Sequence, residues 1–187
     1  PLHPGTSEIV AEAINKAVNK TNMPEGVFNM IFGYTNESGK NLALHPEIKA
    51  VAFTGSFNGG KALFDHAAQR PEPIPVFAEM GSINPVFILP DAQKETQNLA
   101  DTIFNSVTLG AGQFCTNPGL IIIQKSEQTD DLVKSLKQKF KQSESCIMLS
   151  EKIAENYQLK SENHSGIKHV KQIAKGKELI GAFNGTP

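Results

Sequence analysis

The chain has 187 residues, of which 39% are hydrophobic and 20% charged, and its formal net charge is -1. This balance excludes a disordered chain and a basic surface for nucleic acid, and its apolar runs are far shorter than the roughly 20 residues that span a membrane. Two cysteines without a CxxC pair or clustered histidines argue against a disulfide framework or a zinc site. We therefore expect a cytoplasmic protein without a metal, whose partner is a small molecule or another protein.

Helices and strands are expected to alternate in the first 70 or so residues, by their apolar spacing. The expected elements are a helix over 6–20, a strand over 27–32, a helix over 38–45, a strand over 48–53 and a helix over 61–69. This order favours an α/β fold with a parallel, doubly wound sheet, because crossover helices then cover its faces.

Three prolines in 70–75 predict an extended connector, and we place a domain boundary after it, between residues 78 and 79. Beyond the boundary we expect two strands, over 85–89 and 120–124, and four helices, over 94–110, 130–140, 149–157 and 166–176.

Glycines and a serine follow the strand expected at 48–53, in the stretch FTGSFNGG. A strand that runs through Gly55, Ser56 and Gly60 into a helix lets backbone amides and the helix N-terminus meet a diphosphate. The spacing is neither GxGxxG nor a P-loop, and many such turns only satisfy backbone geometry. Both interpretations stay open on these residues alone.

Two further residues are candidates for catalysis. Glu79 lies in an apolar stretch, FAEMGS, where burial would suit a general base, although a paired structural glutamate fits as well. Cys115 lies between glycine-bearing turns in GAGQFCTNPG. An accessible loop position there would suit a nucleophile, but a small buried hydrophobic residue is the other interpretation. Cys146 has no comparable surroundings, and we interpret it as structural. No histidine spacing supports a Cys-His protease.

Three motifs in one order, FTGSFNGG, EMGS and GQFCT, make the chain resemble the aldehyde dehydrogenase superfamily. The family patterns are FTGSxxxG at the cofactor diphosphate, ELGG around the general base and GQxCT around the nucleophile. Glu79 and Cys115 are 36 positions apart, as the family spacing requires. The flanking sequence is similar to the NADP-linked branch that includes fatty-aldehyde and α-ketoglutaric semialdehyde dehydrogenases.

The resemblance implies that Cys115 attacks an aldehyde to give a thiohemiacetal, which passes hydride to the nicotinamide and leaves a thioester. Glu79 would activate the water that hydrolyses the thioester, and the backbone amide of Cys115 would form half of an oxyanion hole. The residues expected to bind the cofactor are Gly55, Ser56, Gly60 and Gly81.

The resemblance also implies a cofactor, NADP or NAD. NAD-preferring relatives carry a glutamate three residues before the proline that aligns with Pro4, and Pro1 holds that place here. Without a carboxylate to repel a 2′-phosphate, NADP would be tolerated. In EMGS, Met80 and Ser82 depart from the family's ELGG, and the serine adds bulk beside the cofactor path.

Because family chains run to several hundred residues, the resemblance implies an internal fragment that does not turn over alone. Residues 1–78 would be the C-terminal part of the NAD(P)-binding domain, and 79–187 the N-terminal part of the catalytic domain. Two alternatives remain: a CoA-acylating aldehyde dehydrogenase, against which Glu79 argues, and a catalytically silent binding or assembly protein of the same fold. The full-length protein is expected to be a dimer or tetramer.

Overall fold

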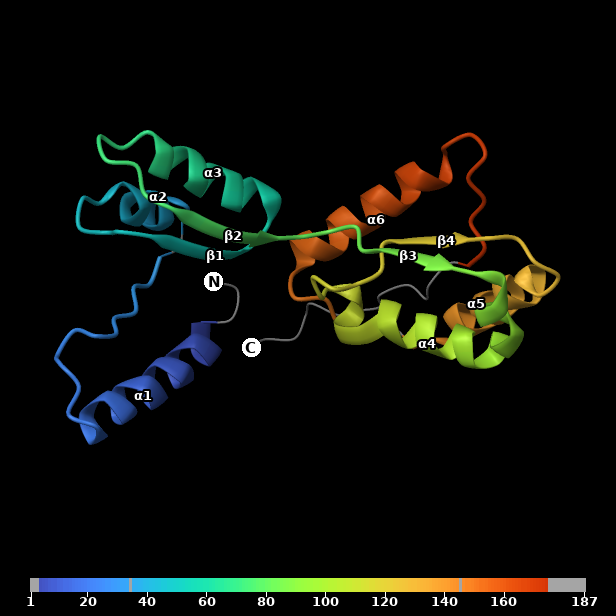
Figure 1. Ribbon diagram of the computed structural model, residues 1–187, viewed down its shortest axis with the longest axis horizontal. Coiled ribbons are helices and arrows are strands. Elements are labelled where there is room, and N and C mark those ends of the chain that lie inside the picture. Colours follow the sequence, from blue (N-terminus) through green and yellow to red (C-terminus); the bar gives the residue numbers. More distant parts are fainter. Residues whose placement is uncertain (1–3, 34, 145, 175–187) are drawn as a thin grey trace. The chain divides into compact units, whose positions relative to one another are not determined.

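The computed structural model describes residues 4–33, 35–144 and 146–174. The chain divides into two compact units, Pro1–Gly81 and Ser82–Pro187 (Figure 1). Each unit holds one pair of parallel strands with helices packed against it. The expected α/β architecture with parallel strands is therefore confirmed.

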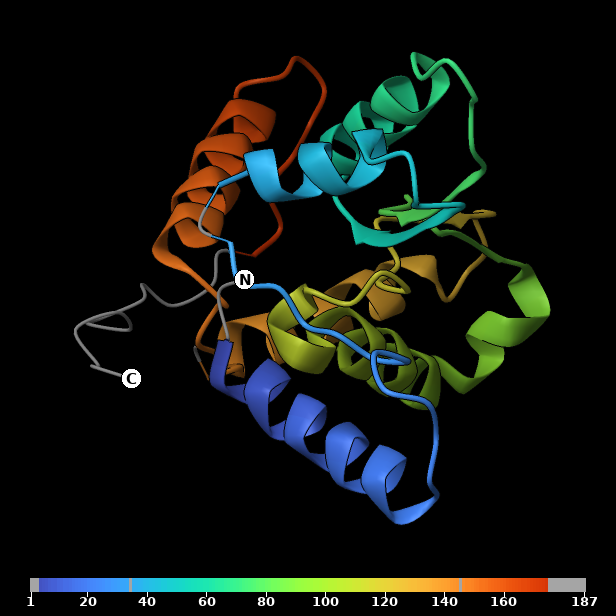
Figure 2. The same cartoon turned by 90° about the vertical axis from the view of Figure 1, so that its left-hand side faces the viewer.

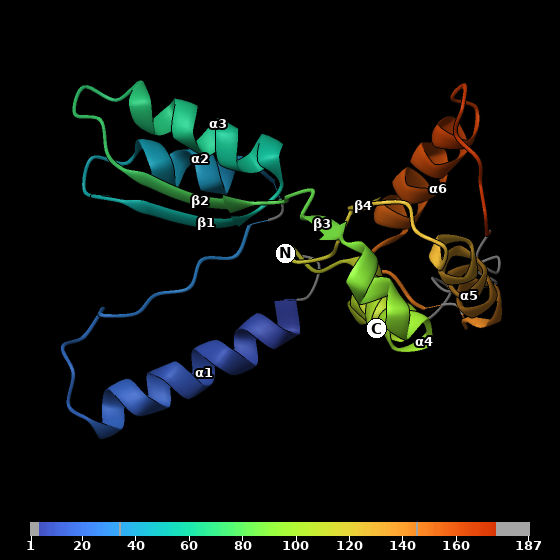
Figure 3. The same ribbon diagram turned by 45° about the vertical axis from the view of Figure 1, so that its right-hand side comes forward.

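Among its described residues, the first unit contains three helices and two strands: α1 (Pro4–Lys20), α2 (Glu37–Leu44), β1 (Val51–Gly55), α3 (Phe57–Ala68) and β2 (Val76–Met80). The two strands pair in parallel, with Thr54 opposite Glu79. Helix α3 packs on both strands and α2 packs on α3, so that both helices lie on one face of the sheet (Figures 2 and 3). Because side chains alternate along a strand, Phe77 points to the opposite face of the sheet. Its side chain is 67% exposed there.

Arg70, only 8% exposed, joins the end of α3 to the connection between α2 and β1. Its guanidinium donates to the carbonyl oxygens of Ala43, Pro46 and Ile48, at 3.3, 3.1 and 2.9 Å. Ala43 lies in the last turn of α2, where the helix dipole favours a cation. These bonds fix the segment that leads into β1.

In the described part of the second unit there are two strands, three α-helices and two short 3₁₀ helices: β3 (Pro85–Ile88), the 3₁₀ helix Pro90–Glu95, α4 (Thr96–Thr108), the 3₁₀ helix Leu109–Gly112, β4 (Leu120–Ile123), α5 (Thr129–Gln142) and α6 (Glu151–Ser165). Strands β3 and β4 pair in parallel and begin together, with Pro85 opposite Leu120. The core joins the strands to α4 and α5 through the buried side chains of Ile88, Ala100, Ile103, Leu132 and Leu136.

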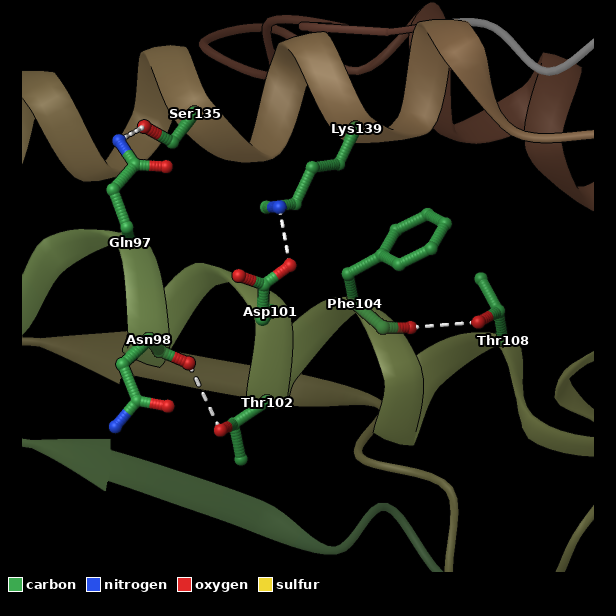
Figure 4. Close-up of polar contacts among 8 residues, drawn as sticks. All are labelled: Gln97, Asn98, Asp101, Thr102, Phe104, Thr108, Ser135 and Lys139. Carbon is green, nitrogen blue, oxygen red and sulfur yellow. Dashed lines mark hydrogen bonds and ion pairs between the residues drawn. The ribbon is translucent and has the colours of Figure 1, made fainter.

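Polar side chains add contacts at the rim of the α4–α5 packing (Figure 4). Gln97 donates to the hydroxyl of Ser135 at 2.9 Å, and Lys139 pairs with Asp101. The carboxylate of Asp101 is 55% exposed, and such exposed ion pairs contribute at most about 1 kcal/mol. The stability of this packing therefore comes mainly from its apolar core.

Two expected elements are missing from the part of the chain that the structure describes. Residues 27–32 form no strand, because no neighbouring strand offers them a hydrogen-bonding edge. Residues 166–174 form no helix, since α6 ends at Ser165 and His169 has a φ of 72°. Residues 175 and 176 of that expected helix lie outside the described ranges.

Helix α1 forms as expected, but its apolar side chains are poorly covered, with Ile9 71% and Val10 53% exposed. In the described ranges, no helix is long and apolar enough to cross a membrane.

Candidate functional site

The predicted cofactor turn lies at the carboxyl end of β1, where the strand passes into α3. Ser56 is the N-cap of α3, and its Oγ accepts a hydrogen bond from the N–H of Gly59 at 3.2 Å. The N–H of Gly60 donates to the Ser56 carbonyl at 3.0 Å. Within the described residues the N–H groups of Phe57 and Asn58 have no acceptor. The start of α3 therefore keeps two donors, together with its positive dipole end, for an anion.

Glycines in this turn allow close packing of the helix and the strands. A Cβ on Gly55 would lie 2.6 Å from the ring of Phe53, and one on Gly60 would lie 2.7 Å from the Met80 sulfur and 3.2 Å from the Ala78 Cβ. Gly60 thus lets α3 approach β2. The interpretation of these glycines as structural is supported, and it is compatible with cofactor binding, because a tight turn also exposes backbone amides.

Glu79 is the penultimate residue of β2, and its side chain is exposed. In the described structure it has no hydrogen-bond or ion-pair partner, so the paired structural glutamate is not observed. Glu79 is not buried as its flanking sequence suggested, because Ala78 and Met80 point to the opposite face of the sheet, toward α3. Phe77, on the same face as Glu79, is itself 67% exposed.

The carboxyl ends of β1 and β2 share one edge of the sheet, because the two strands are parallel. This edge carries Gly55, the last residue of β1, followed by Ser56, and Glu79 near the end of β2, followed by Gly81. A Cβ on Gly81 would meet no atom within 4 Å, so the space beside it is open. The first unit thus brings the predicted cofactor turn and the predicted base to the same edge, where open α/β sheets commonly bind ligands.

Cys115 lies in the second unit, on the turn between the 3₁₀ helix Leu109–Gly112 and β4. Its side chain is exposed, and so is that of Cys146, so neither cysteine is a buried hydrophobe. The backbone N–H of Cys115 has no acceptor among the residues that the structure describes. An exposed thiol beside a free N–H is the arrangement that nucleophilic attack on a carbonyl requires.

The backbone before Cys115 has an unusual conformation. Three consecutive residues, Gly110, Ala111 and Gly112, have φ values of 58°, 57° and 74°. The two glycines adopt this left-handed region readily, whereas Ala111 does so at a cost of about 1 kcal/mol. The ring of Phe114 also covers Gly110, where a Cβ would lie 2.3 Å from it.

Two side-chain amides hold the Cys115 loop, which we define as residues 113–119. Asn84 donates through Nδ2 to the carbonyl oxygens of Cys115 and Asn117, at 2.7 and 2.9 Å. Asn117 in turn donates through Nδ2 to the carbonyl of Val107 at 2.7 Å. Neither asparagine had an expected role. In the sequence, Asn84 lies between the motif EMGS and Pro85, directly before an expected strand. That position was the available indication that Asn84 could contact the site.

Gln113 is a third residue without a predicted role, although it belongs to the motif GQFCT. Its side-chain amide donates to the carbonyl of Gly110 at 3.1 Å and accepts from the N–H of Leu149 at 2.9 Å. Ser82 accepts a hydrogen bond from the N–H of Asn84 at 3.3 Å, so its hydroxyl has a local backbone partner. Across the described ranges, no group of three or more His, Cys, Asp or Glu side chains could hold a metal ion.

A model of the aldehyde dehydrogenase family matches residues 2–156, a range that contains the cofactor turn, Glu79 and Cys115. The chain belongs to the aldehyde dehydrogenase family. It is 46% identical to the α-ketoglutaric semialdehyde dehydrogenase of Acinetobacter baylyi over 157 residues, which are 83% of this chain and 30% of that protein. It is 42% identical to α-ketoglutaric semialdehyde dehydrogenase 2 of Azospirillum brasilense over 176 residues, 94% of this chain and 34% of the relative.

The chain spans about a third of the length of these aldehyde dehydrogenases. Among solved structures, it is similar to an NAD-dependent aldehyde dehydrogenase from Sinorhizobium meliloti, with a TM-score of 0.70 and 30% identity over 87% of this chain and 33% of that one. These matches confirm the family resemblance drawn from the three motifs, including its similarity to α-ketoglutaric semialdehyde dehydrogenases. Pro1, the residue used to argue for NADP, lies outside the matched range and the described residues.

Proposed function

We propose that this chain is part of an enzyme that oxidises an aldehyde to a carboxylic acid with NADP or NAD. The observation that carries this proposal is the single family match across the cofactor turn, Glu79 and Cys115. Both catalytic candidates are exposed, as direct contact with a substrate or a water molecule requires. The names of the two curated relatives favour a semialdehyde substrate.

We propose two domains, whose bounds differ from those of the two units only at residues 79–81. Residues 1–78 would belong to the NAD(P)-binding domain and 79–187 to the catalytic domain. The division of the chain after Gly81, just beyond β2, supports a boundary in this region. Assembly of the full-length protein as a dimer or tetramer stays a prediction, which sedimentation of that protein would test.

The first turn of α3 fits the diphosphate of a dinucleotide. Ser56 and the free N–H groups of Phe57 and Asn58 would hold it, while Gly55 and Gly60 keep the turn compact. The open space beside Gly81 at the same sheet edge would leave room for the cofactor. When bound, the nicotinamide supplies the hydride acceptor. We favour NADP because Pro1 replaces the glutamate expected in NAD-preferring relatives.

Cys115 would form the covalent bond to the substrate. Its thiolate attacks the aldehyde carbon, and the negative charge that develops on the oxygen is stabilised by the free N–H of Cys115. Departure of hydride from the same carbon leaves a thioester on the cysteine.

Glu79 would then act as the general base. Its carboxylate takes a proton from a water molecule, which attacks the thioester carbon. The carbon–sulfur bond breaks, the acid leaves, and the thiolate of Cys115 is regenerated. The exposed, unpartnered carboxylate in the described structure is available for this proton transfer.

The test uses the complete protein that carries this segment, with a semialdehyde substrate and NADP. Cys115→Ser should abolish NADPH formation, whereas Cys146→Ser should leave it unchanged. Glu79→Gln should give one burst of NADPH and accumulate an acyl adduct on Cys115, visible by mass spectrometry, because hydrolysis has lost its base. The exposed Glu72→Gln serves as the matched control.

Turnover by Cys115→Ser would contradict the assigned nucleophile, and unimpaired steady-state turnover by Glu79→Gln would contradict the assigned base. Faster thioester release with added coenzyme A than with water alone would identify the acylating alternative. If the wild-type protein forms neither NADPH from NADP nor NADH from NAD, a silent protein of the same fold is favoured.

A further inference from the structure

We infer that Asn84 is a positioning residue, which fixes the backbone of the Cys115 loop through its side-chain amide. The inference rests on the proposed role of Cys115 as the nucleophile. Asn84 is not assigned to the chemistry itself, because its contacts are with backbone carbonyls and not with the thiol.

The backbone of Asn84 directs its side chain to the loop. Its φ is 47°, in the left-handed region that asparagine tolerates better than most residues, and its N–H donates to the hydroxyl of Ser82 at 3.3 Å. Nδ2 carries two hydrogens, and its bonds to the carbonyls of Cys115 and Asn117 use both of them. One short side chain therefore fixes two peptide groups of the loop.

The sheet brings these two segments together. Strands β3 and β4 begin at Pro85 and Leu120, which are paired, so the residues before each strand run side by side. The N–H of Gly119 donates to the carbonyl of Ile83 at 2.8 Å, and a Cβ on Gly119 would lie only 3.0 Å from that oxygen. This contact extends the pairing of the strands to the base of the Cys115 loop.

The bonds from Asn84 have a direct consequence for Cys115. They fix the peptide group that carries the Cys115 carbonyl, while the N–H and thiol of the same residue have no hydrogen-bond partner in the part of the chain that the structure describes. The segment before the loop, with Gly110 and Gly112 in left-handed conformations, offers little rigidity of its own. Asn84 thus holds the nucleophile in one orientation, which lowers the entropy lost on reaching the attack geometry.

The chemistry of the contact explains why an amide is needed. Aspartate has nearly the same shape and tolerates the same φ, but its carboxylate only accepts, so it would face two carbonyl oxygens without a donor. Glycine keeps the left-handed backbone and removes both bonds. Asn84→Asp and Asn84→Gly therefore remove the contact in two different ways.

The experiment measures alkylation of Cys115 and Cys146 by iodoacetamide in the 187-residue chain, by peptide mass spectrometry as a function of pH. Asn156→Asp is the matched control, because Asn156 donates to the Lys152 carbonyl at 2.8 Å on α6. Asn84→Gly should reduce the advantage of Cys115 over Cys146 to about twofold or less. Asn84→Asp should also move the pH profile of Cys115 upward, by up to about one pH unit, because a nearby carboxylate disfavours the thiolate. The profile of Cys146 should not move in either variant, and Asn156→Asp should behave as the wild type.

A second measurement separates this inference from the proposed function. Hydrogen exchange of the hydrogen-bonded amides of Asn117 and Gly119 should accelerate at least about tenfold in both Asn84 variants, with exchange in α4 unchanged. If wild-type Cys115 has no advantage over Cys146, the proposed function fails, and the exchange rates still test whether Asn84 holds the loop. The inference would be overturned if both Asn84 variants showed the same hydrogen-exchange rates and the same alkylation profiles as the wild type.

Discussion

In the first unit the candidate residues stand at the carboxyl ends of parallel strands, whereas in the second they stand before the amino ends. Ser56 and Glu79 are placed by the strands and the helix that carry them, through pairing of β1 with β2 and packing of α3. Cys115 lies on a loop that depends on side-chain amides, chiefly those of Asn84 and Asn117. The positions of the proposed base and the proposed cofactor turn therefore follow from the regular structure, whereas the proposed nucleophile depends on side-chain anchors.

The largest expected effect concerns helix packing in the first unit. Gly60→Val should lower the free energy of unfolding by about 2 kcal/mol, because the added side chain collides with Met80 and Ala78. Gly81→Val is the matched control and should change it by no more than about 0.5 kcal/mol, since the space there is open. Urea unfolding, monitored by hydrogen exchange in β1 and β2, measures the change in the free energy of unfolding for both substitutions. Equal effects of the two substitutions would break the argument that Gly60 sets the distance between α3 and β2.

An intermediate effect is expected at the helix N-caps, one in each unit. Ser56→Ala should destabilise α3 by about 1 kcal/mol, because the N–H of Gly59 loses its acceptor. Ser150→Ala removes a bond from the N–H of Ile153, which also donates to the Ser150 carbonyl at 3.1 Å, so it should destabilise α6 by less than Ser56→Ala destabilises α3. Site-resolved hydrogen exchange reports each helix separately. Unchanged hydrogen exchange in α3 of the Ser56→Ala variant would show that Ser56 is not needed as a cap.

The smallest effect is expected in the strained segment before Cys115. Ala111→Gly relieves the left-handed strain at φ 57° but adds freedom to the unfolded chain, so it should stabilise the fold by only about 0.5 kcal/mol. Gly110→Ala introduces the same strain and brings a Cβ against the ring of Phe114, so it should destabilise the fold. The melting temperatures of the two variants, compared with the wild type, give the sign of each change in stability. Stabilisation by Gly110→Ala would contradict the assigned backbone conformation.

Much of the fold could be predicted from the sequence, because most elements have clear local patterns. The run LIII became β4, and the spacing of Leu132 and Leu136 became the buried face of α5. The run at 27–32 looked equally strand-like, but a strand needs a partner, and the described residues supply none beside it. Local hydrophobicity cannot show whether a partner exists.

The candidate site was predicted from motifs, and its geometry was only partly foreseen. The position of Ser56 at a helix start follows from its sequence context, as does the place of Cys115 on a loop. The exposure of Glu79 did not follow, because its apolar neighbours point to the other face of the strand. The contact of Asn84 with the Cys115 loop spans 31 positions and depends on the pairing of β3 with β4. Spacing along the chain carries no signal for such a contact.

Competitive alkylation of the native chain tests most directly whether Cys115 is the nucleophile that we propose. Limiting iodoacetamide below pH 8 should modify Cys115 at least about tenfold faster than Cys146, although both thiols are exposed, because Asn84 and Asn117 hold the loop that presents the Cys115 thiol. Addition of NADP should change the rate at Cys115 only. Equal, slow modification of the two cysteines would contradict the account.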